Sequence, residues 1–576
     1  MALSGIFPLD SIPVLSLLKS TACFRCDLLP ERSDCPPLRP STYMADIQEL
    51  EFDAFPPVSP PRRSTWKSVL LVATCTLAMI TNLASSSAVS SFLPVIARDL
   101  HIPESQLQWL VSAFSLSSVC LPVGFCLDDP FGVQGCLLLL LGRLADLWGR
   151  KRFFVIGTSW LAVFSLGCGF ARDSTTLYIL RGLQGIGPAA FLPACVGILA
   201  HGFPESGARN IAFATFSAGA PMSGAVGTQI SALLAQKTPA SWRAPFYFLA
   251  GLSALCALGG LLAIDDDIPS LEMDKRVDWI GAFLVTTGLV LLLFVLGQGQ
   301  LASQGWKTPY ILALLFVGLL AIGLFLAWQH YLEQNSERST SLPPPLMKLS
   351  LWSRANGKFA VMQVIAFFEW AGFLTWFFWS QVYYEDYVKF TPILTALRML
   401  PMSIAGFLCN FFVVFLVSRI DLVYLVVFGT TFTGIAGLLM ALIHPGAPYW
   451  AYGFPSPIVS VFGGDFVFAA GTLFIAKISL PHEQSLSGGI FQTLMQLGTA
   501  FGLAISTIVL TSVSGGRSAG MGAPLEAYHA AQWTAFGMAI GCSVLAIVFL
   551  RGVEPVGIPA DADVPEESSV DESVKS

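Results

Sequence analysis

Four charged side chains lie inside long apolar stretches of the sequence and are the residues best suited to proton chemistry: Glu369, Asp465, Arg181 and Arg398. A charge in apolar surroundings costs free energy, so such residues are functional by default. Removing water from a carboxylate favours its protonated form, which lets it exchange a proton near neutral pH. We therefore predict that Glu369 and Asp465 carry protons. The alternative is that one of them is the structural partner of Arg398 or Arg181.

Amide and aromatic side chains on the same stretches are candidates for contact with a bound organic molecule. An apolar pocket with a few polar groups suits hydrophobic ligands better than sugars. The alternative for the aromatic residues is packing between helices. The candidate residues are Gln184, Gln363, Phe368, Trp370, Trp376, Gln492 and Gln496.

The composition indicates that these stretches lie in a lipid bilayer. The chain has 576 residues, of which 54% are hydrophobic and 12% charged, and its mean hydropathy is +0.68. Soluble domains carry about 25% charged residues. The net charge of −6 comes largely from the acidic C-terminal tail, and nothing in the sequence indicates nucleic-acid binding. Without a phosphate-binding loop, metal-ligand cluster or nucleophile constellation, we expect no enzyme activity and no metal or cofactor.

Fourteen stretches are long and apolar enough to be transmembrane helices, which need about 20 residues each. We predict an all-α integral membrane protein with two six-helix bundles and two extra central helices. The fourteen ranges are 68–93, 106–142, 153–171, 174–200, 210–234, 244–264, 279–298, 309–331, 359–383, 391–417, 422–443, 449–476, 485–513 and 531–550.

The distribution of Lys and Arg predicts the orientation of these helices. With the N-terminus in the cytosol, seventeen basic residues from Arg62 onward fall on the cytosolic side and seven fall outside. Cytosolic loops are enriched in Lys and Arg, so both termini are expected in the cytosol. The predicted parts are a disordered tail (1–66), a six-helix bundle (67–265), two extra helices (277–331), a cytosolic loop (332–356), a second six-helix bundle (357–552) and a disordered acidic tail (553–576).

Two segments fit this plan poorly. The second stretch is too long for one span and holds Asp128 and Asp129 near its centre. Each carboxylate would cost roughly 3 kcal/mol at the middle of the bilayer. We interpret residues 119–134 as a translated, retained intron, because their removal leaves one clean span; the alternative is a genuine extracellular or re-entrant insertion. Residues 1–43 contain no sustained apolar run, and Met44 is our candidate for the true start.

The run Gly142–Arg152, with sequence GRLADLWGRKR, joins the second and third predicted spans. It resembles the signature of the major facilitator superfamily and departs from it only at Leu147, where a basic residue is common. The resemblance implies a cytosolic latch that holds the two bundles together in one state. The alternative is a positively charged loop without a gating role. The residues that match the signature are Gly142, Arg143, Asp146, Gly149, Arg150, Lys151 and Arg152.

Two further runs resemble motifs of the same superfamily. Leu177–Ala190 is similar to its second motif, which implies that Arg181 takes part in proton transfer; the alternative is that Arg181 reaches the outer interface. Ser217–Gly227 matches the antiporter motif in part, with Pro221 and Gly224 present and alanines in place of two glycines. A proline among small residues lets a helix bend and pack closely.

Val277–Trp306 and Phe462–Ala504 resemble the fungal fourteen-spanner drug:proton antiporter group. This implies a monomer in the plasma membrane, or in the vacuolar membrane, that exports small organic molecules in exchange for protons. Asn82 stands in the first span, where many members carry an aspartate, so the resemblance places proton coupling on later spans. The alternatives are an uptake carrier for a nutrient or inorganic solute, and a membrane sensor that does not transport.

Overall fold

The computed structural model describes residues 64–100, 133–203, 207–266, 276–299, 305–335, 342–480, 483–515 and 523–553. All of them belong to one compact unit, Arg63–Ser576. Every regular element in these ranges is helical. The predictions for residues 1–43, for most of 119–134 and for the acidic tail beyond Val553 lie outside the described residues.

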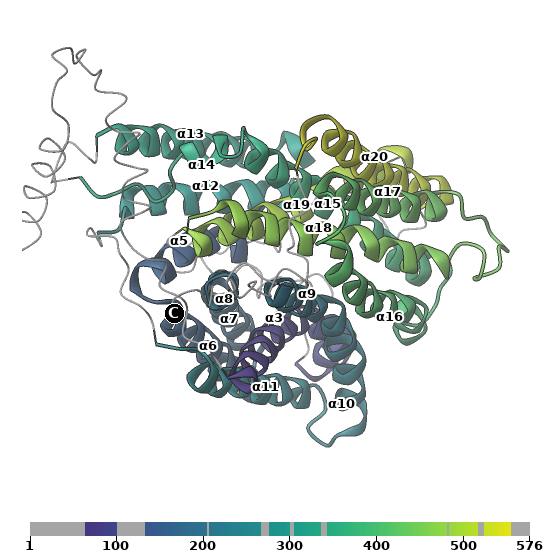
Figure 1. Ribbon diagram of the computed structural model, residues 1–576. Coiled ribbons are helices and arrows are strands. Elements are labelled where there is room, and N and C mark those ends of the chain that lie inside the picture. The colour runs from purple at the N-terminus through teal and green to yellow at the C-terminus, as the bar shows by residue number, and fades with distance from the viewer. Residues whose placement is uncertain are drawn as a thin grey trace, which may run out of the picture. The chain divides into compact units, whose positions relative to one another are not determined.

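The N-terminal group of helices ends near residue 264 (Figure 1). Within it, α3 (Thr65–Asp99) packs against α9 (Gly207–Gly224) and α11 (Arg243–Ala263), and α6 (Arg150–Phe170) packs against α8 (Ile186–Gly202) and α11. The group consists of α3 (Thr65–Asp99), α5 (Val133–Trp148), α6 (Arg150–Phe170), α7 (Ser174–Gln184), α8 (Ile186–Gly202), α9 (Gly207–Gly224), the π-helix η2 (Ala225–Ile230), α10 (Ser231–Lys237) and α11 (Arg243–Ala263).

An extra pair of helices and a C-terminal group complete the described chain (Figure 1). The extra pair is α12 (Trp279–Gln298) and α13 (Pro309–Asn335), joined by η3 (Gly305–Lys307) and followed by the short α14 (Ser350–Ser353). The C-terminal group is α15 (Lys358–Val382), η4 (Tyr383–Tyr387), α16 (Pro392–Leu416), α17 (Leu422–Ala441), α18 (Pro455–Ile478), α19 (Gln484–Val513) and α20 (Leu525–Phe549).

Capping residues and prolines explain where several helices begin. Asp173 accepts a hydrogen bond from the N–H of Thr176 at 2.7 Å at the start of α7, and Asp278 accepts one from Gly281 at 2.8 Å at the start of α12. Side chains of this kind satisfy N–H groups that have no partner within the helix. The helix α18 opens with Pro455, whose missing N–H costs nothing at a first position.

The all-helical membrane fold is confirmed, while fourteen crossings stay a prediction. Each predicted range contains a described helix, but only eleven helices in the described ranges are long and apolar enough on their own to cross a membrane. The second range is described only from Val133, the fifth is interrupted by η2, and the tenth has a shorter apolar stretch, Leu394–Asn410. Helix α13 extends to Asn335, into the segment predicted as a loop.

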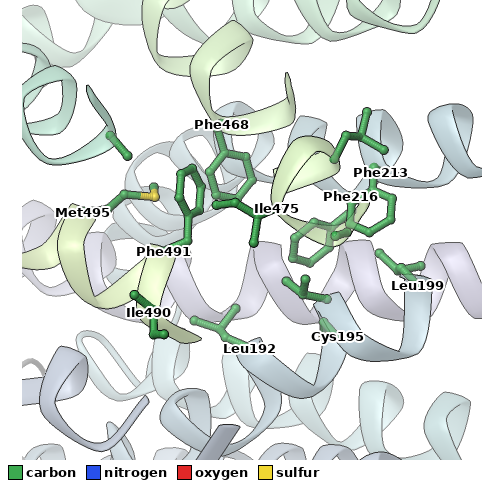
Figure 2. Packing of buried hydrophobic residues seen from close by; sticks show 14 of the residues in the cluster. Leu192, Cys195, Leu199, Phe213, Phe216, Phe468, Ile475, Ile490, Phe491 and Met495 are labelled. Atoms are coloured by element: carbon green, nitrogen blue, oxygen red, sulfur yellow. The ribbon is translucent and has the colours of Figure 1, made fainter. Parts of the chain in front are cut away.

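Hydrophobic side chains from both groups meet in one core between them. Figure 2 shows Leu192 and Leu199 of α8 and Phe216 of α9 facing residues of α18 and α19. The ring of Phe216 stacks on that of Phe468 at a centroid distance of 6.2 Å, and Phe491 lies 6.3 Å from Phe468. The two groups therefore contact each other through apolar surfaces, with aromatic rings at the centre.

Two glycines allow α6 and α8 to approach until their backbones touch. A Cβ added at Gly187 would lie 2.6 Å from the carbonyl oxygen of Gly157 and 3.0 Å from the backbone nitrogen of Leu161. Small residues at helix crossings permit this close packing in membranes. We predict that Gly187→Ala lowers the apparent Tm in detergent, because overpacking costs about 1–3 kcal/mol.

The matched control is Gly251→Ala on α11, where an added Cβ has nothing within 4 Å. That variant should unfold at the wild-type temperature or slightly above it, because alanine favours a helix by roughly 1 kcal/mol over glycine. Equal apparent Tm values for the two alanine variants would contradict the proposed tight crossing.

Candidate functional site

Asp146, near the end of α5, joins the N-terminal group to the start of α19. Its Oδ2 accepts a hydrogen bond from the backbone N–H of Leu486 at 3.0 Å, across 340 residues of sequence. Its Oδ1 lies 2.7 Å from Nη2 of Arg150, and Nε of Arg150 also donates to it at 2.9 Å. The side chain has no exposed surface. A carboxylate at a helix N-terminus satisfies N–H groups and interacts favourably with the helix dipole.

The other residues of the Gly142–Arg152 run surround this contact. Gly142 lies where a Cβ would be 3.0 Å from the carbonyl oxygen of Ser485, so only glycine fits against α19 without a shift. Gly149 has φ of 114°, a backbone conformation that side chains disfavour, and it lets α6 begin directly after α5. Arg143 is buried and Arg152 is exposed.

Two basic residues of the run hold other helices of the N-terminal group. Arg150 donates from Nη1 to the carbonyl oxygen of Gly197 on α8 at 3.0 Å. Lys151 forms an ion pair with Asp266, just after α11, at 2.8 Å. The hydrogen bond from Lys151 and its charge hold the pKa of Asp266 below the usual value. The run therefore connects α5, α6, α8 and the end of α11, and through Asp146 it reaches α19.

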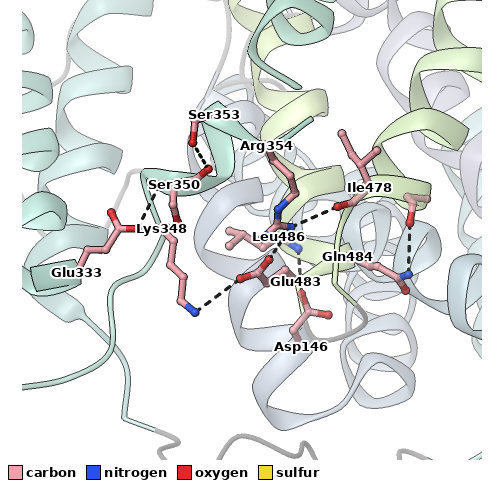
Figure 3. A network of polar contacts seen from close by, with 11 residues as sticks. Asp146, Glu333, Lys348, Ser350, Ser353, Arg354, Ile478, Glu483, Gln484 and Leu486 are labelled. Atoms are coloured by element: carbon pink, nitrogen blue, oxygen red, sulfur yellow. Dashed lines mark hydrogen bonds and ion pairs between the residues drawn. The ribbon is translucent and has the colours of Figure 1, made fainter. Parts of the chain in front are cut away.

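Glu483, the residue before α19, lies beside the same contact, although sequence reasoning missed it. Its Oε2 lies 3.0 Å from Nη1 of Arg354, and Nζ of Lys348 is 4.0 Å from Oε1 (Figure 3). Its side chain is 5% exposed. The available signal was a carboxylate directly before a long apolar helix, which is a common position for a group that stabilises a helix start.

Arg181 lies entirely within the N-terminal group. It is fully buried and donates from Nη1 to the carbonyl oxygen of Ser85 on α3 at 2.9 Å and to Oε1 of Gln184 at 2.8 Å. Gln184 in turn donates to Ser165 on α6 at 2.6 Å. The structure thus brings Arg181 and Gln184 together, as their spacing on one helix face predicts, and joins them to α3 and α6.

Glu369 lies within the C-terminal group. It is 0% exposed, and its Oε1 accepts a hydrogen bond from Oγ1 of Thr433 on α17 at 2.6 Å. Gly463 of α18 is close to both side chains, because a Cβ added there would clash with Oγ1 of Thr433 and with Oε1 of Glu369. The second carboxylate oxygen of Glu369, Oε2, has no hydrogen-bond partner among the described residues.

Asp465 lies on α18, beside residues of α16. Asn410 and Cys409 of α16 are its neighbours. Its Oδ2 has no hydrogen-bond partner in the described part of the chain, and neither has Oδ1 of Asn410. Phe468, one turn further along α18, stacks on Phe216 of the N-terminal group, so Asp465 is close to the junction between the groups.

Arg398 is placed among aromatic rings near the start of α16. Its guanidinium carbon lies 4.4 Å from the ring centroid of Phe390 and 4.7 Å from that of Tyr449. The hydroxyl of Tyr449 donates to the carbonyl oxygen of Arg398 at 2.8 Å. Cations over aromatic faces are stabilised by the ring quadrupole, so these rings account for the position of Arg398 without a carboxylate.

The predicted ligand-contacting residues divide between packing and polar positions. Trp370 packs on Phe468 at a centroid distance of 6.0 Å, in the central aromatic cluster. Gln363 is fully buried, and neither end of its amide has a hydrogen-bond partner among the described residues. The Nε2 of Gln492 also has no hydrogen-bond partner among the described residues. Gln496 is half-buried. Buried amides of this kind are available to the polar groups of a ligand or to water.

Pro221 and Gly224 lie where α9 meets α16. A Cβ added at Gly406 of α16 would touch Pro221, and one added at Gly224 would lie 3.2 Å from Oγ of Ser403. The helix changes to the π-helix η2 directly after Gly224. A proline followed by a π-helical turn is a point at which a helix departs from regular geometry.

The chain is similar to known membrane transporters. The family model described as Major Facilitator Superfamily matches residues 75–276. Relatives include MFS-type transporter 1 of Pyricularia oryzae, 27% identical over 86% of this chain and 85% of the relative. The low affinity ammonium transporter of Saccharomyces cerevisiae is 28% identical over 84% and 88% of the two chains. Efflux pump terJ of Aspergillus terreus is 26% identical over 85% and 89%.

A solved structure shares the fold. The human organic anion transporter MFSD10 superposes with a TM-score of 0.56 at 14% identity, covering 84% of this chain and all of that chain. At that level of identity the likeness concerns the fold alone. Taken with the family match over residues 75–276, it leads to one conclusion: the chain is a multi-pass membrane protein with the fold of the Major Facilitator Superfamily and is similar in sequence to its members.

Proposed function

We propose that this protein is a secondary transporter that exports small organic molecules in exchange for protons by alternating access. The observation that carries the proposal is Asp465, a buried carboxylate with one unpartnered oxygen close to the junction of the two helix groups. An acid in such surroundings can bind a proton without leaving a buried charge. Its position lets the bound proton influence how the two groups contact each other.

Between the two buried carboxylates, the surroundings favour Asp465 for proton coupling. Glu369 faces Thr433 and Gly463, inside the C-terminal group. Asp465 is one turn from Phe468, which contacts Phe216 of the N-terminal group. A coupling group must change its environment when the groups move. The carboxylate of Glu369 is bound by Thr433 of its own group, whereas Asp465 lies one turn from the ring of Phe468 that contacts the other group.

The side chains at the junction support a hydrophobic organic substrate. Rings of Phe216, Phe468, Trp370 and Phe491 form a continuous aromatic cluster there. The unpartnered amides of the same helices, such as Gln363, supply a small number of hydrogen-bonding groups. Sites with this balance bind hydrophobic organic molecules. The efflux-pump relative in Aspergillus terreus agrees with export of such molecules.

The second candidate function is a carrier for an inorganic or nutrient solute. The relative named as a low affinity ammonium transporter, at 28% identity over most of both chains, favours it. The direction of transport depends on gradients and coupling, which a shared fold leaves open.

The proposed setting is the plasma membrane, with both chain ends in the cytosol and the protein acting as a monomer; the vacuolar membrane is the alternative. The basic run Arg150–Arg152 supports the orientation, because Lys and Arg are enriched in cytosolic loops. The latch at Asp146 would then close the cytosolic side of the transporter.

A flux measurement with purified protein in liposomes distinguishes the two functions. We expect an imposed pH gradient to drive accumulation of hydrophobic dyes such as ethidium, and a protonophore to abolish it. An equal rate of dye flux with and without the pH gradient would refute proton antiport. Gradient-driven uptake of radiolabelled methylammonium, without dye flux, would instead support the second function.

A further inference from the structure

The extra helix pair packs against the two helices that the Asp146 contact joins. Helix α12 packs against α5 and also against α19. Ala282, Val285 and Leu289 of α12 belong to the same buried apolar cluster as Leu138 of α5. The extra pair therefore contacts both helices that the latch joins.

A strap, defined here as residues 342–357, is bound to α13 near its middle. Gln329 of α13 is fully buried, and its Oε1 accepts a hydrogen bond from the N–H of Met347 at 3.1 Å. One turn later, the Glu333 carboxylate accepts N–H hydrogen bonds from Leu349 at 3.0 Å and from the next residue at 3.1 Å. Two side chains of α13 thus hold the backbone of the strap.

The same buried glutamine ties α13 to α12. Nε2 of Gln329 donates to Oδ2 of Asp278 at 2.6 Å, and Nε1 of Trp328 donates to Oδ1 of Asp278 at 2.9 Å. Asp278 also caps α12 through the N–H of Gly281. Buried hydrogen bonds of this kind are costly to break. The two extra helices and the strap up to Ser350 are therefore expected to move together.

The far end of the strap holds the residue that precedes α19. Arg354 forms an ion pair with Glu483 at 3.0 Å and donates to the carbonyl oxygen of Ile478, the last residue of α18, at 3.4 Å (Figure 3). Lys348 lies 4.0 Å from the same carboxylate. A nearly buried carboxylate held by a cation orients the backbone that carries it.

The first turn of α19 is therefore held from two sides. Asp146 binds the N–H of Leu486 from the N-terminal group, and Arg354 binds Glu483, three residues earlier, from the strap. We propose that the extra pair and its strap position the start of α19 for Asp146, so that Glu483 and Arg354 are positioning residues of the cytosolic latch. This inference rests on the alternating-access function proposed above.

A thiol reporter in the first turn of α19 tests the proposal. Ser487 is 0% exposed, and its hydroxyl has no hydrogen-bond partner among the described residues, so Ser487→Cys changes little. Full-length protein in liposomes is treated with a membrane-impermeant maleimide, and labelling at that position is read by mass spectrometry. Glu483→Gln should raise the labelling rate roughly fivefold, the lower range of ordinary conformational coupling. Arg354→Gln and Glu333→Ala should raise it in the same direction.

The matched control is Asp266→Asn, which removes a cytosolic ion pair within the N-terminal group, at 2.8 Å from Lys151. It should leave the labelling rate unchanged. An unchanged rate in both Glu483→Gln and Arg354→Gln, or an equal rise in Asp266→Asn, would overturn the proposal. Labelling requires neither substrate nor a proton gradient, so this outcome is distinguishable from a failure of proton antiport in the flux measurement.

Discussion

Asp146→Ala is expected to lower the initial rate of transport at least about tenfold, which corresponds to about 1.4 kcal/mol. Both carboxylate oxygens are in use, one by Arg150 and the other by the N–H of Leu486. Removing one partner of a buried ion pair costs about 3–5 kcal/mol. Because the contact to Leu486 joins the two helix groups, we expect its loss to destabilise the closed state that the proposed alternating-access cycle requires. Initial rates in liposomes, at equal amounts of protein, measure the effect.

The graded variant Asp146→Asn separates the two interactions of the carboxylate. The amide keeps an oxygen for the N–H of Leu486 but loses the charge that pairs with Arg150, so its rate should lie between those of wild type and the alanine variant. The control is Arg152→Gln, which changes an exposed charge of the same run and should alter the rate by less than about twofold. A wild-type transport rate in Asp146→Ala would show that the contact between Asp146 and Leu486 does not control transport.

The local geometry of the Gly142–Arg152 run could be predicted from sequence, but the helix that it contacts, α19, could not. Its residue types predict a tight turn and a carboxylate that caps a helix. In the structure Gly149 has φ of 114°, and Asp146 accepts a hydrogen bond from the N–H of Leu486. Which helix it caps could not be predicted, because Leu486 is 340 residues away and no local pattern connects the two. Glu483 was missed for the same reason: its importance comes from Arg354, a distant partner.

The buried charges show a second limit of sequence reasoning. Glu369, Asp465 and Arg398 all lie in apolar stretches, and hydropathy treats them alike. Packing separates them, since Glu369 faces Thr433 within its own group, whereas Arg398 lies over aromatic rings. These differences depend on how helices rotate against one another, and apolar helices with polar residues on several faces give no strong periodicity from which to predict that rotation.

Asp465→Asn is expected to abolish accumulation driven by a pH gradient. One proton that moves down one pH unit supplies about 1.4 kcal/mol, enough for about tenfold accumulation of substrate. Asparagine is similar in size and can still contact Asn410, but it cannot take up a proton. Downhill exchange of substrate should therefore persist while the accumulation ratio falls to one. The measurement is the steady-state dye ratio across liposomes, with and without the imposed gradient.

Glu369→Gln is the matched comparison, because it neutralises the other buried carboxylate and keeps an Oε1 acceptor for the hydroxyl of Thr433. It should retain gradient-driven accumulation. Glu369→Leu removes that acceptor and leaves the buried hydroxyl without it, which costs about 1–3 kcal/mol and should lower the apparent Tm. Loss of accumulation in Glu369→Gln together with normal accumulation in Asp465→Asn would move the coupling site to Glu369. Normal accumulation in both variants would contradict proton coupling through buried carboxylates, since Glu369 and Asp465 are the two that the described helices bury near their centres.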